Sequence, residues 1–182
     1  MAKERIDRDA YLTPYWCIDG LMPLIRFNPG DVLSEPAKGD GRIIERFPPN
    51  HKVKWAEIAE GVDYLTTPEE MRADVIVTNP PYSHALEFIS TALDRDLAQG
   101  GTLILLLRTG ILGSKTRADF WRKYPPTHQL VLTPRPSFAF GGSDNSEYAW
   151  FCWDYGNRIT TPHVWTLKKD EIEALAQEVA CG

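Results

Sequence analysis

Short apolar runs alternate with helical stretches along most of this 182-residue chain, and this alternation is what most constrains its fold. The apolar runs predicted as strands are residues 31–34, 52–56, 64–65, 74–78 and 102–107. The stretches predicted as helices between them are residues 42–47, 83–98 and 115–124. Strands that alternate with helices in this way indicate βαβ units and a mostly parallel sheet. We therefore expect an α/β fold.

The end of the chain follows a different pattern. Two apolar runs, residues 129–132 and 148–153, have no helix between them, which predicts an antiparallel hairpin at the edge of the sheet. Residues 168–179 then carry apolar side chains at helical spacing, which predicts a closing amphipathic helix. The length is that of one domain, and we expect a single domain over residues 1–182.

The composition excludes several classes of protein. The three cysteines are far apart and the four histidines are scattered, so neither a disulfide framework nor a zinc site is indicated. The longest apolar run, residues 103–107, is too short to cross a bilayer. The first seven residues contain no apolar core of an export signal. We expect no metal, no membrane partner and a reducing cytoplasm.

The charge of the chain is unevenly distributed. The formal net charge is -5, yet residues 108–135 carry six basic side chains and one acidic one. A basic segment on an acidic chain indicates either a solvated helix face or a phosphate-binding surface. The candidate phosphate contacts in it are Lys115, Arg117 and Arg122.

A glycine-rich turn follows the first predicted strand. Residues 35–41 read Glu-Pro-Ala-Lys-Gly-Asp-Gly, at the strand end where open α/β sheets bind ligands. Gly39 and Gly41 allow the backbone to approach a ligand closely. The acidic Glu35 and Asp40 would repel a phosphate and favour a cation. The turn is therefore a candidate site for a positively charged ligand.

Residues 79–82, Asn-Pro-Pro-Tyr, carry the strongest signal in the chain. They follow a buried strand directly, at the same ligand-binding edge of the sheet. The two prolines remove two donors and fix the backbone, so that carbonyl oxygens face outward. Asn79 and the Pro80 carbonyl present two acceptors, and Tyr82 presents a ring for stacking. This arrangement suits an amino group on a flat heterocycle.

The turn and this loop together, Glu-Pro-x-x-Gly-x-Gly and Asn-Pro-Pro-Tyr, resemble the motifs of class I S-adenosylmethionine-dependent methyltransferases of the adenine-N6 DNA type. The resemblance covers roughly residues 11–153 as the catalytic core and leaves residues 154–182 as a C-terminal extension. It implies a Rossmann-like, seven-stranded, mostly parallel sheet with a terminal antiparallel hairpin. It also implies S-adenosylmethionine as cofactor, DNA as partner, and methylation of the exocyclic N6 of adenine.

The resemblance also implies roles for individual residues. The residues that would border the methionine end and the sulfonium of the cofactor are Tyr11, Thr13, Pro14, Glu35, Pro36, Gly39, Gly41 and Asn79. Glu57 would bind the ribose hydroxyls, Ile58 would contact the adenine ring, and Asp63 would accept from the adenine amino group. The catalytic loop would be Asn79, Pro80, Pro81 and Tyr82, with Tyr82 and Phe138 against the acceptor base.

Other acceptors share this chemistry. Asn-Pro-Pro motifs also occur in methyltransferases of RNA bases and of protein glutamine amides, whose nitrogen lone pairs are likewise delocalised. A third possibility is a non-catalytic, cofactor-binding partner subunit. Only 52 residues separate Tyr82 from Arg135, which leaves no room for a target-recognition domain. We therefore expect little or short sequence specificity, or help from a second copy or a recruiting partner, as in compact enzymes of phage type.

Overall fold

A single mixed sheet forms the centre of the molecule. The computed structural model describes residues 12–67, 71–138 and 145–181. Its strands are β1 Val32–Glu35, β2 Lys52–Trp55, β3 Ala73–Thr78, β4 Leu97–Arg108, β5 His128–Thr133, β6 Tyr148–Asp154 and β7 Val164–Lys168. They form one seven-stranded sheet in the order β2-β1-β3-β4-β6-β5-β7.

The directions of the strands agree with the predicted sheet. Strands β2, β1, β3 and β4 are parallel to one another, and β6 is antiparallel to both β4 and β5. The predicted α/β sheet of seven mostly parallel strands and the antiparallel hairpin of β5 and β6 are therefore confirmed.

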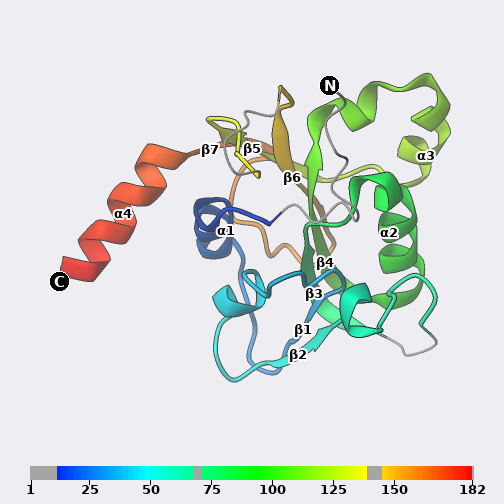
Figure 1. Cartoon of the computed structure of the whole chain (residues 1–182), viewed down its shortest axis with the longest axis horizontal. Coiled ribbons are helices and arrows are strands. Elements are labelled where there is room, and N and C mark those ends of the chain that lie inside the picture. The colour runs from blue at the N-terminus through cyan, green and yellow to red at the C-terminus, as the bar shows by residue number, and fades with distance from the viewer. Residues whose placement is uncertain (1–11, 68–70, 139–144, 182) are drawn as a thin grey trace.

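Helices cover both faces of this sheet (Figure 1). Helix α1, Tyr15–Leu21, packs on one face, and α2, Ala85–Thr91, packs on the other. Helix α3, Ala118–Lys123, lies beyond the end of β4, and α4, Lys169–Cys181, extends away from the body. No helix in the described part of the chain is long and apolar enough to span a membrane.

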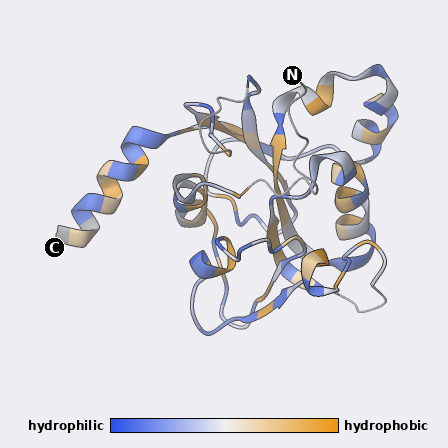
Figure 2. Cartoon of the chain, viewed as in Figure 1, coloured by the Kyte–Doolittle hydropathy of each residue, from blue (hydrophilic) through white to orange (hydrophobic). Residues whose placement is uncertain are grey.

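Strand β4 is the centre of the core. Its residues alternate between the two sides: Ile104 and Leu106 face the cluster that contains α1, and Leu103 and Leu105 face the cluster that contains α2. All four are completely buried. A parallel sheet covered on both faces needs such a continuous apolar run, and Figure 2 shows the apolar residues gathered along the central strands.

The segment predicted as a third strand, residues 64–65, is instead a turn. The Asp63 side chain accepts a hydrogen bond from the Leu65 N–H at 3.0 Å, and the Asp63 carbonyl accepts from the N–H groups of Thr66 and Thr67. An aspartate that bonds the backbone two residues ahead initiates a turn rather than a strand. The prediction for this segment was therefore wrong.

The seventh strand is β7, which the sequence analysis did not predict. It pairs in parallel with β5, from Gln129 opposite Val164 to Thr133 opposite Lys168. The predicted hairpin is therefore covered by another strand and does not lie at the edge of the sheet. Only Leu167 of β7 is buried. A single buried apolar position is too little to predict a strand from the sequence.

The predicted helices are shorter than their apolar patterns suggested. Residues 42–47 form only the 3-10 turn Ile44–Arg46. Helix α2 continues into a π-helical turn, Ala92–Asp96, after which β4 begins directly. The basic stretch 115–124 begins with the 3-10 turn Lys115–Arg117 and becomes α-helical only in α3.

Helix α4 is attached to the body through its first turns. Ile172 packs over Gly20 of α1 so closely that a Cβ atom at Gly20 would lie 2.4 Å from Ile172 Cδ1. Beyond this contact the helix is exposed, and Leu175 keeps 63% of its surface accessible. The predicted C-terminal helix is thus present, and glycine at residue 20 permits its attachment.

Candidate active site

A pocket of about 650 Å³ lies where three parallel strands end. Glu35 ends β1, Glu57 follows β2 and Asn79 follows β3, and all three line the pocket. Since β2, β1 and β3 are adjacent and parallel, their carboxyl ends meet at one edge of the sheet. This edge is where open α/β sheets bind ligands.

Glu35 is a buried acid at the base of this pocket. Its side chain is 2% exposed, and Oε2 has no hydrogen-bond partner among the described residues. Burial raises the pKa of Glu35 to about 9, although the Ile44 N–H acts in the opposite direction. Glu35 is therefore protonated at neutral pH in the absence of a ligand, and a cation in the pocket would favour its ionisation.

Glu57 organises the glycine-rich turn. Its Oε2 accepts a hydrogen bond from the Gly39 N–H at 2.7 Å, and its Oε1 accepts from the Ala59 N–H at 2.9 Å. Gly39 has a φ of 56°, in the left-handed region that glycine adopts without strain. Each carboxylate oxygen can accept more than one hydrogen bond, so Glu57 can hold the turn and still bind hydroxyl groups.

The segment before α1 closes one side of the pocket. Thr13 is 6% exposed, and its hydroxyl accepts a hydrogen bond from Asn79 Nδ2 at 3.1 Å. Arg42 Nη1 donates to the Thr13 carbonyl at 3.3 Å, while Arg42 Nε donates to Asp40 at 2.7 Å. Thr13 thereby connects the loop after β3 with the turn after β1. Asn79 acts as the donor in this contact, through its amide nitrogen.

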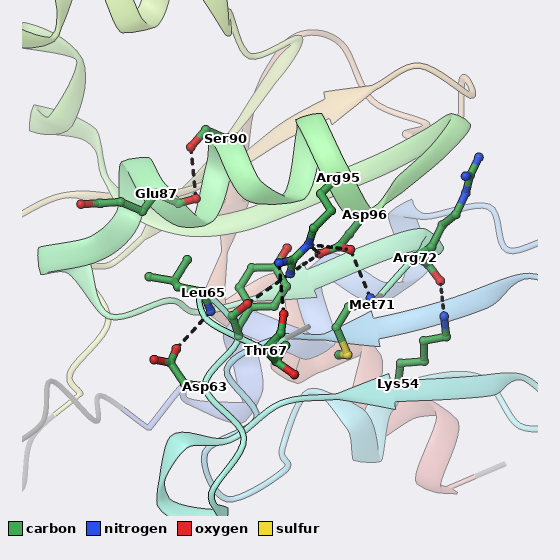
Figure 3. Close-up of polar contacts among 11 residues, drawn as sticks. Lys54, Asp63, Leu65, Thr67, Met71, Arg72, Glu87, Ser90, Arg95 and Asp96 are labelled. Atoms are coloured by element: carbon green, nitrogen blue, oxygen red, sulfur yellow. Dashed lines mark hydrogen bonds and ion pairs between the residues drawn. The ribbon is translucent and has the colours of Figure 1, made fainter. Parts of the chain in front are cut away.

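Another wall of the pocket, residues 62–66, is held by a charged pair. Arg95 donates to the Tyr64 carbonyl at 3.1 Å and forms an ion pair with Asp96 at 2.9 Å (Figure 3). Asp96 is fully buried and also accepts from the Met71 N–H at 3.1 Å. These contacts fix the wall to the turn after α2. The wall is therefore shaped before a ligand binds.

A second pocket, of about 430 Å³, lies beside the other end of the Asn79–Tyr82 loop. Tyr82 lines it, together with Arg108 at the end of β4 and Arg117 before α3. The Arg108 guanidinium lies 5.2 Å from the centre of the Tyr82 ring. The loop after β3 thus contributes Asn79 and Pro81 to the larger pocket and Tyr82 to the second one.

The structure gathers most of the predicted cofactor residues around the larger pocket. Those that line it are Thr13, Glu35, Pro36, Gly39, Glu57, Ile58, Asp63 and Asn79. Pro14, Gly41 and Pro80 do not line it: Pro14 precedes α1, and Pro80 is buried. Tyr11 lies outside the described residues.

The residues predicted to bind the acceptor do not all lie at the second pocket. Phe138 packs against Tyr148, with ring centres 4.7 Å apart, and Tyr148 in turn lies 5.8 Å from Tyr82. Arg117 lines the second pocket, whereas Lys115 and Arg122 line neither pocket. Arg122 is 81% exposed and pairs with Asp119 at 3.1 Å. The structure therefore brings only part of the basic segment to the site.

Several lining residues were missed by sequence reasoning. Val62, Leu65 and Phe88 add apolar surface to the larger pocket. Phe88 belongs to the apolar face of α2, where its spacing indicates a core residue and nothing more. Arg108 ends the most apolar strand, and that position at a strand end could have identified it. Among the described residues, no group of three or more His, Cys, Asp and Glu side chains could hold a metal.

Comparisons with known proteins identify the fold. No protein-family profile matches this chain, and no curated protein is recognisably similar to it in sequence. Among solved structures, a type I restriction-modification methyltransferase subunit from Streptococcus thermophilus matches 94% of this chain and 53% of its own length, with a TM-score of 0.63 and 15% identity.

Two other solved structures show how broadly the fold is used. A dimethyladenosine transferase from Plasmodium falciparum matches 75% of this chain and 59% of its own length, with a TM-score of 0.53 and 15% identity. A precorrin-6Y C5,15-methyltransferase from Geobacter metallireducens matches 83% of this chain and 94% of its own length, with a TM-score of 0.55 and 13% identity. The chain spans about half the length of the type I subunits that it resembles.

Proposed function

We propose that this chain, whose fold is that of the class I methyltransferases, transfers a methyl group from S-adenosylmethionine to the exocyclic N6 of adenine in DNA, with little or short sequence specificity. The observation that carries the proposal is the position of residues 79–82. They follow β3 and contribute to both pockets, so a donor in one pocket and an acceptor in the other would meet at this loop.

The larger pocket fits S-adenosylmethionine by its chemistry. Glu35 has a buried oxygen without a partner among the described residues, which suits the positively charged end of the cofactor. Glu57 has acceptor capacity for the ribose hydroxyls. Ile58 is 63% exposed beside the pocket and offers an apolar surface to the adenine ring. The bound cofactor would supply a methyl group activated by its attachment to a positively charged sulfur.

The loop can activate an amino group without removing a proton in advance. The lone pair of the exocyclic nitrogen of adenine is delocalised into the ring, which makes the nitrogen a poor nucleophile. Asn79 Oδ1 and the Pro80 carbonyl oxygen can each accept a hydrogen bond from one N–H of this amino group. Together they draw the nitrogen towards a tetrahedral geometry. The same oxygens stabilise the positive charge that develops during transfer, which is preorganised electrostatic catalysis.

Tyr82 provides a surface for the base. An adenine must leave the duplex to reach the loop, at a cost of a few kcal/mol. Stacking on an aromatic ring returns roughly 1–3 kcal/mol. Arg108 and Tyr148 contact the Tyr82 ring and hold it in place beside the second pocket. A dimethyladenosine transferase shares this fold, which supports adenine as the acceptor.

The test is to identify the methylated product. Purified protein is incubated with radiolabelled S-adenosylmethionine and a mixture of DNA, RNA and protein, and the three fractions are separated and counted. We expect the label in DNA, and mass spectrometry should identify N6-methyladenine. Label in the protein fraction alone, on glutamine, would overturn the proposal in favour of the amide-methylating alternative.

A further inference from the structure

Two guanidinium groups line the second pocket. Arg108 and Arg117 both line it, beside Tyr82 and the apolar Leu107 and Ile111. Its volume of about 430 Å³ lies within the range of small-molecule sites. The two arginines come from opposite ends of the connection between β4 and α3, so the fold brings them together.

Arg117 holds a donor that the protein does not use. Its side chain is partly buried, and its Nε is buried with no hydrogen-bond partner among the described residues. Leaving a buried N–H of a charged group without a partner is costly, because water no longer solvates it. An acceptor brought into the pocket by a ligand would remove that cost.

Arg108 is fixed in position beside it. Its Nε donates to the Tyr148 hydroxyl at 3.0 Å, and its guanidinium lies 5.2 Å from the Tyr82 ring centre and 5.9 Å from the Tyr148 ring centre. Contacts on two rings restrict the orientation of a side chain that is otherwise flexible. A planar guanidinium held in this way is suited to bind the oxygens of an anion.

Among the described residues that line the pocket, the acid Glu147 does not cancel this charge. Glu147 lines the pocket but forms an ion pair with Arg135, which lowers the pKa of the Glu147 carboxyl. Its negative charge is therefore offset by a third arginine. Arg122, in contrast, is exposed and paired with Asp119. Among the described residues, Arg117 thus brings positive charge of the basic segment to the second pocket, beside Arg108.

We infer that the second pocket binds a phosphate group of the acceptor, through Arg117 and Arg108, next to the base that stacks on Tyr82. The inference rests on the proposed function and specifies its acceptor as a nucleotide within a polynucleotide. A glutamine side chain carries no phosphate, so an amide acceptor would not bring this anion to Arg117. Arg117 is thus a specificity-determining residue, and it acts on acceptor binding rather than on the transferred methyl group.

The test compares two arginines of the same segment. Arg117→Gln and Arg122→Gln remove the same charge five residues apart, but only Arg117 lines the pocket. With a DNA oligonucleotide, we expect Arg117→Gln to raise KM by roughly 10-fold or more, since hydrogen bonds to charged groups have effects of this size. The salt dependence of binding should fall by about one unit of slope, as for one lost phosphate contact. Arg122→Gln should match the wild type in both.

Further measurements separate the possible failures. Affinity for S-adenosylmethionine should be unchanged in both variants, and this result also shows that the variants fold. Arg117→Lys keeps the charge and should restore part of the salt dependence of binding. Equal KM values and slopes for Arg117→Gln and Arg122→Gln, in a protein that methylates DNA, would overturn this inference alone. Methyl transfer to peptides but not to any polynucleotide would overturn the proposed function and the inference together. RNA methylated with the same loss in Arg117→Gln would support the phosphate contact and correct only the polymer.

Discussion

The two pockets to which the Asn79–Tyr82 loop contributes differ in the side chains that the strand ends bring to them. The larger one carries carboxyl groups, Glu35 and Glu57, at the ends of β1 and β2. The second one carries guanidinium groups, Arg108 and Arg117, after β4. One loop therefore separates a surface suited to a cation and hydroxyl groups from a surface suited to an anion.

The two pockets also differ in how they are built. The larger one uses the ends of adjacent parallel strands, which the topology of the sheet brings together. The second one uses the end of β4, the turn before α3 and residues 145–147 before β6. The lining of the larger pocket therefore follows from strand order, whereas the lining of the second pocket depends on the connections between the strands.

The largest expected effect is on the cofactor side and comes from Gly39→Val. Valine strongly disfavours the φ of 56° at this position, and its side chain would enter the open space of the pocket. We expect calorimetry to detect no S-adenosylmethionine binding. Gly30→Val is the matched control, because Gly30 has a φ of 87° and equally open surroundings but lines neither pocket. If both variants bind equally well, the larger pocket is not the cofactor site.

The loop between the pockets is tested by Asn79→Ala. This change removes an acceptor that acts mainly in the transition state, so kcat should fall roughly 100- to 1000-fold, with nearly constant cofactor affinity. Thr13→Val provides the control, since it removes the hydrogen-bond partner of Asn79 Nδ2 and keeps the oxygen. Its loss of activity should be much smaller. An Asn79→Ala enzyme within a few-fold of the wild type would exclude Asn79 from catalysis.

A smaller effect is expected for Glu57→Ala. Losing charge-assisted hydrogen bonds to the ribose should weaken cofactor binding by roughly 1–3 kcal/mol, measured by calorimetry. Glu60→Ala removes the same charge from a neighbouring acid that pairs with Lys38 and does not line the pocket. Equal losses in the two variants would mean that general charge, and not the position of Glu57, determines binding.

The last comparison concerns the pH dependence of stability through Glu35, which needs no ligand. Because burial raises its pKa to about 9, the folded protein binds a proton that the unfolded chain loses near the ordinary value of 4.5. The free energy of unfolding therefore falls as pH rises between these two values. Glu35→Gln, which stays neutral, should show a higher Tm at pH 8 than the wild type, with a smaller difference at pH 5. At roughly 2–4 °C for each kcal/mol, thermal melts resolve this change. If the Tm values of the wild type and of Glu35→Gln change in parallel with pH, burial does not raise the pKa of Glu35.

The sequence anticipated the lining of the larger pocket better than the lining of the second one, for physical reasons. Glu35, Glu57 and Asn79 follow strands whose parallel pairing is implied by the βαβ pattern, so their meeting at one edge could be anticipated. The contact between Tyr82 and Arg108 depends on how the end of β4 passes the loop after β3. Local sequence patterns contain no information on that distance.

Two further discrepancies have local causes. The charge pattern alone could not separate Arg117 from Arg122, because the partner of Arg122 is the nearby Asp119, while Arg117 faces residues from a distant connection. The turn at residues 64–65 was mistaken for a strand because the hydrogen bond from Leu65 to Asp63 is not visible in an apolar pattern. The roles assigned to the individual lining residues remain predictions that the variants above test.

Strand β7 has a consequence for how the protein avoids association. Without it, the backbone of β5 from Gln129 to Thr133 would present unpaired N–H and C=O groups beside the antiparallel pair, a template for aggregation. With it, the outermost strand is only five residues long, ends in Lys168 and leads at once into α4. A short strand with a terminal charge is a poor template for another chain. The C-terminal extension therefore acts as a cap that shields the hairpin edge from intermolecular pairing.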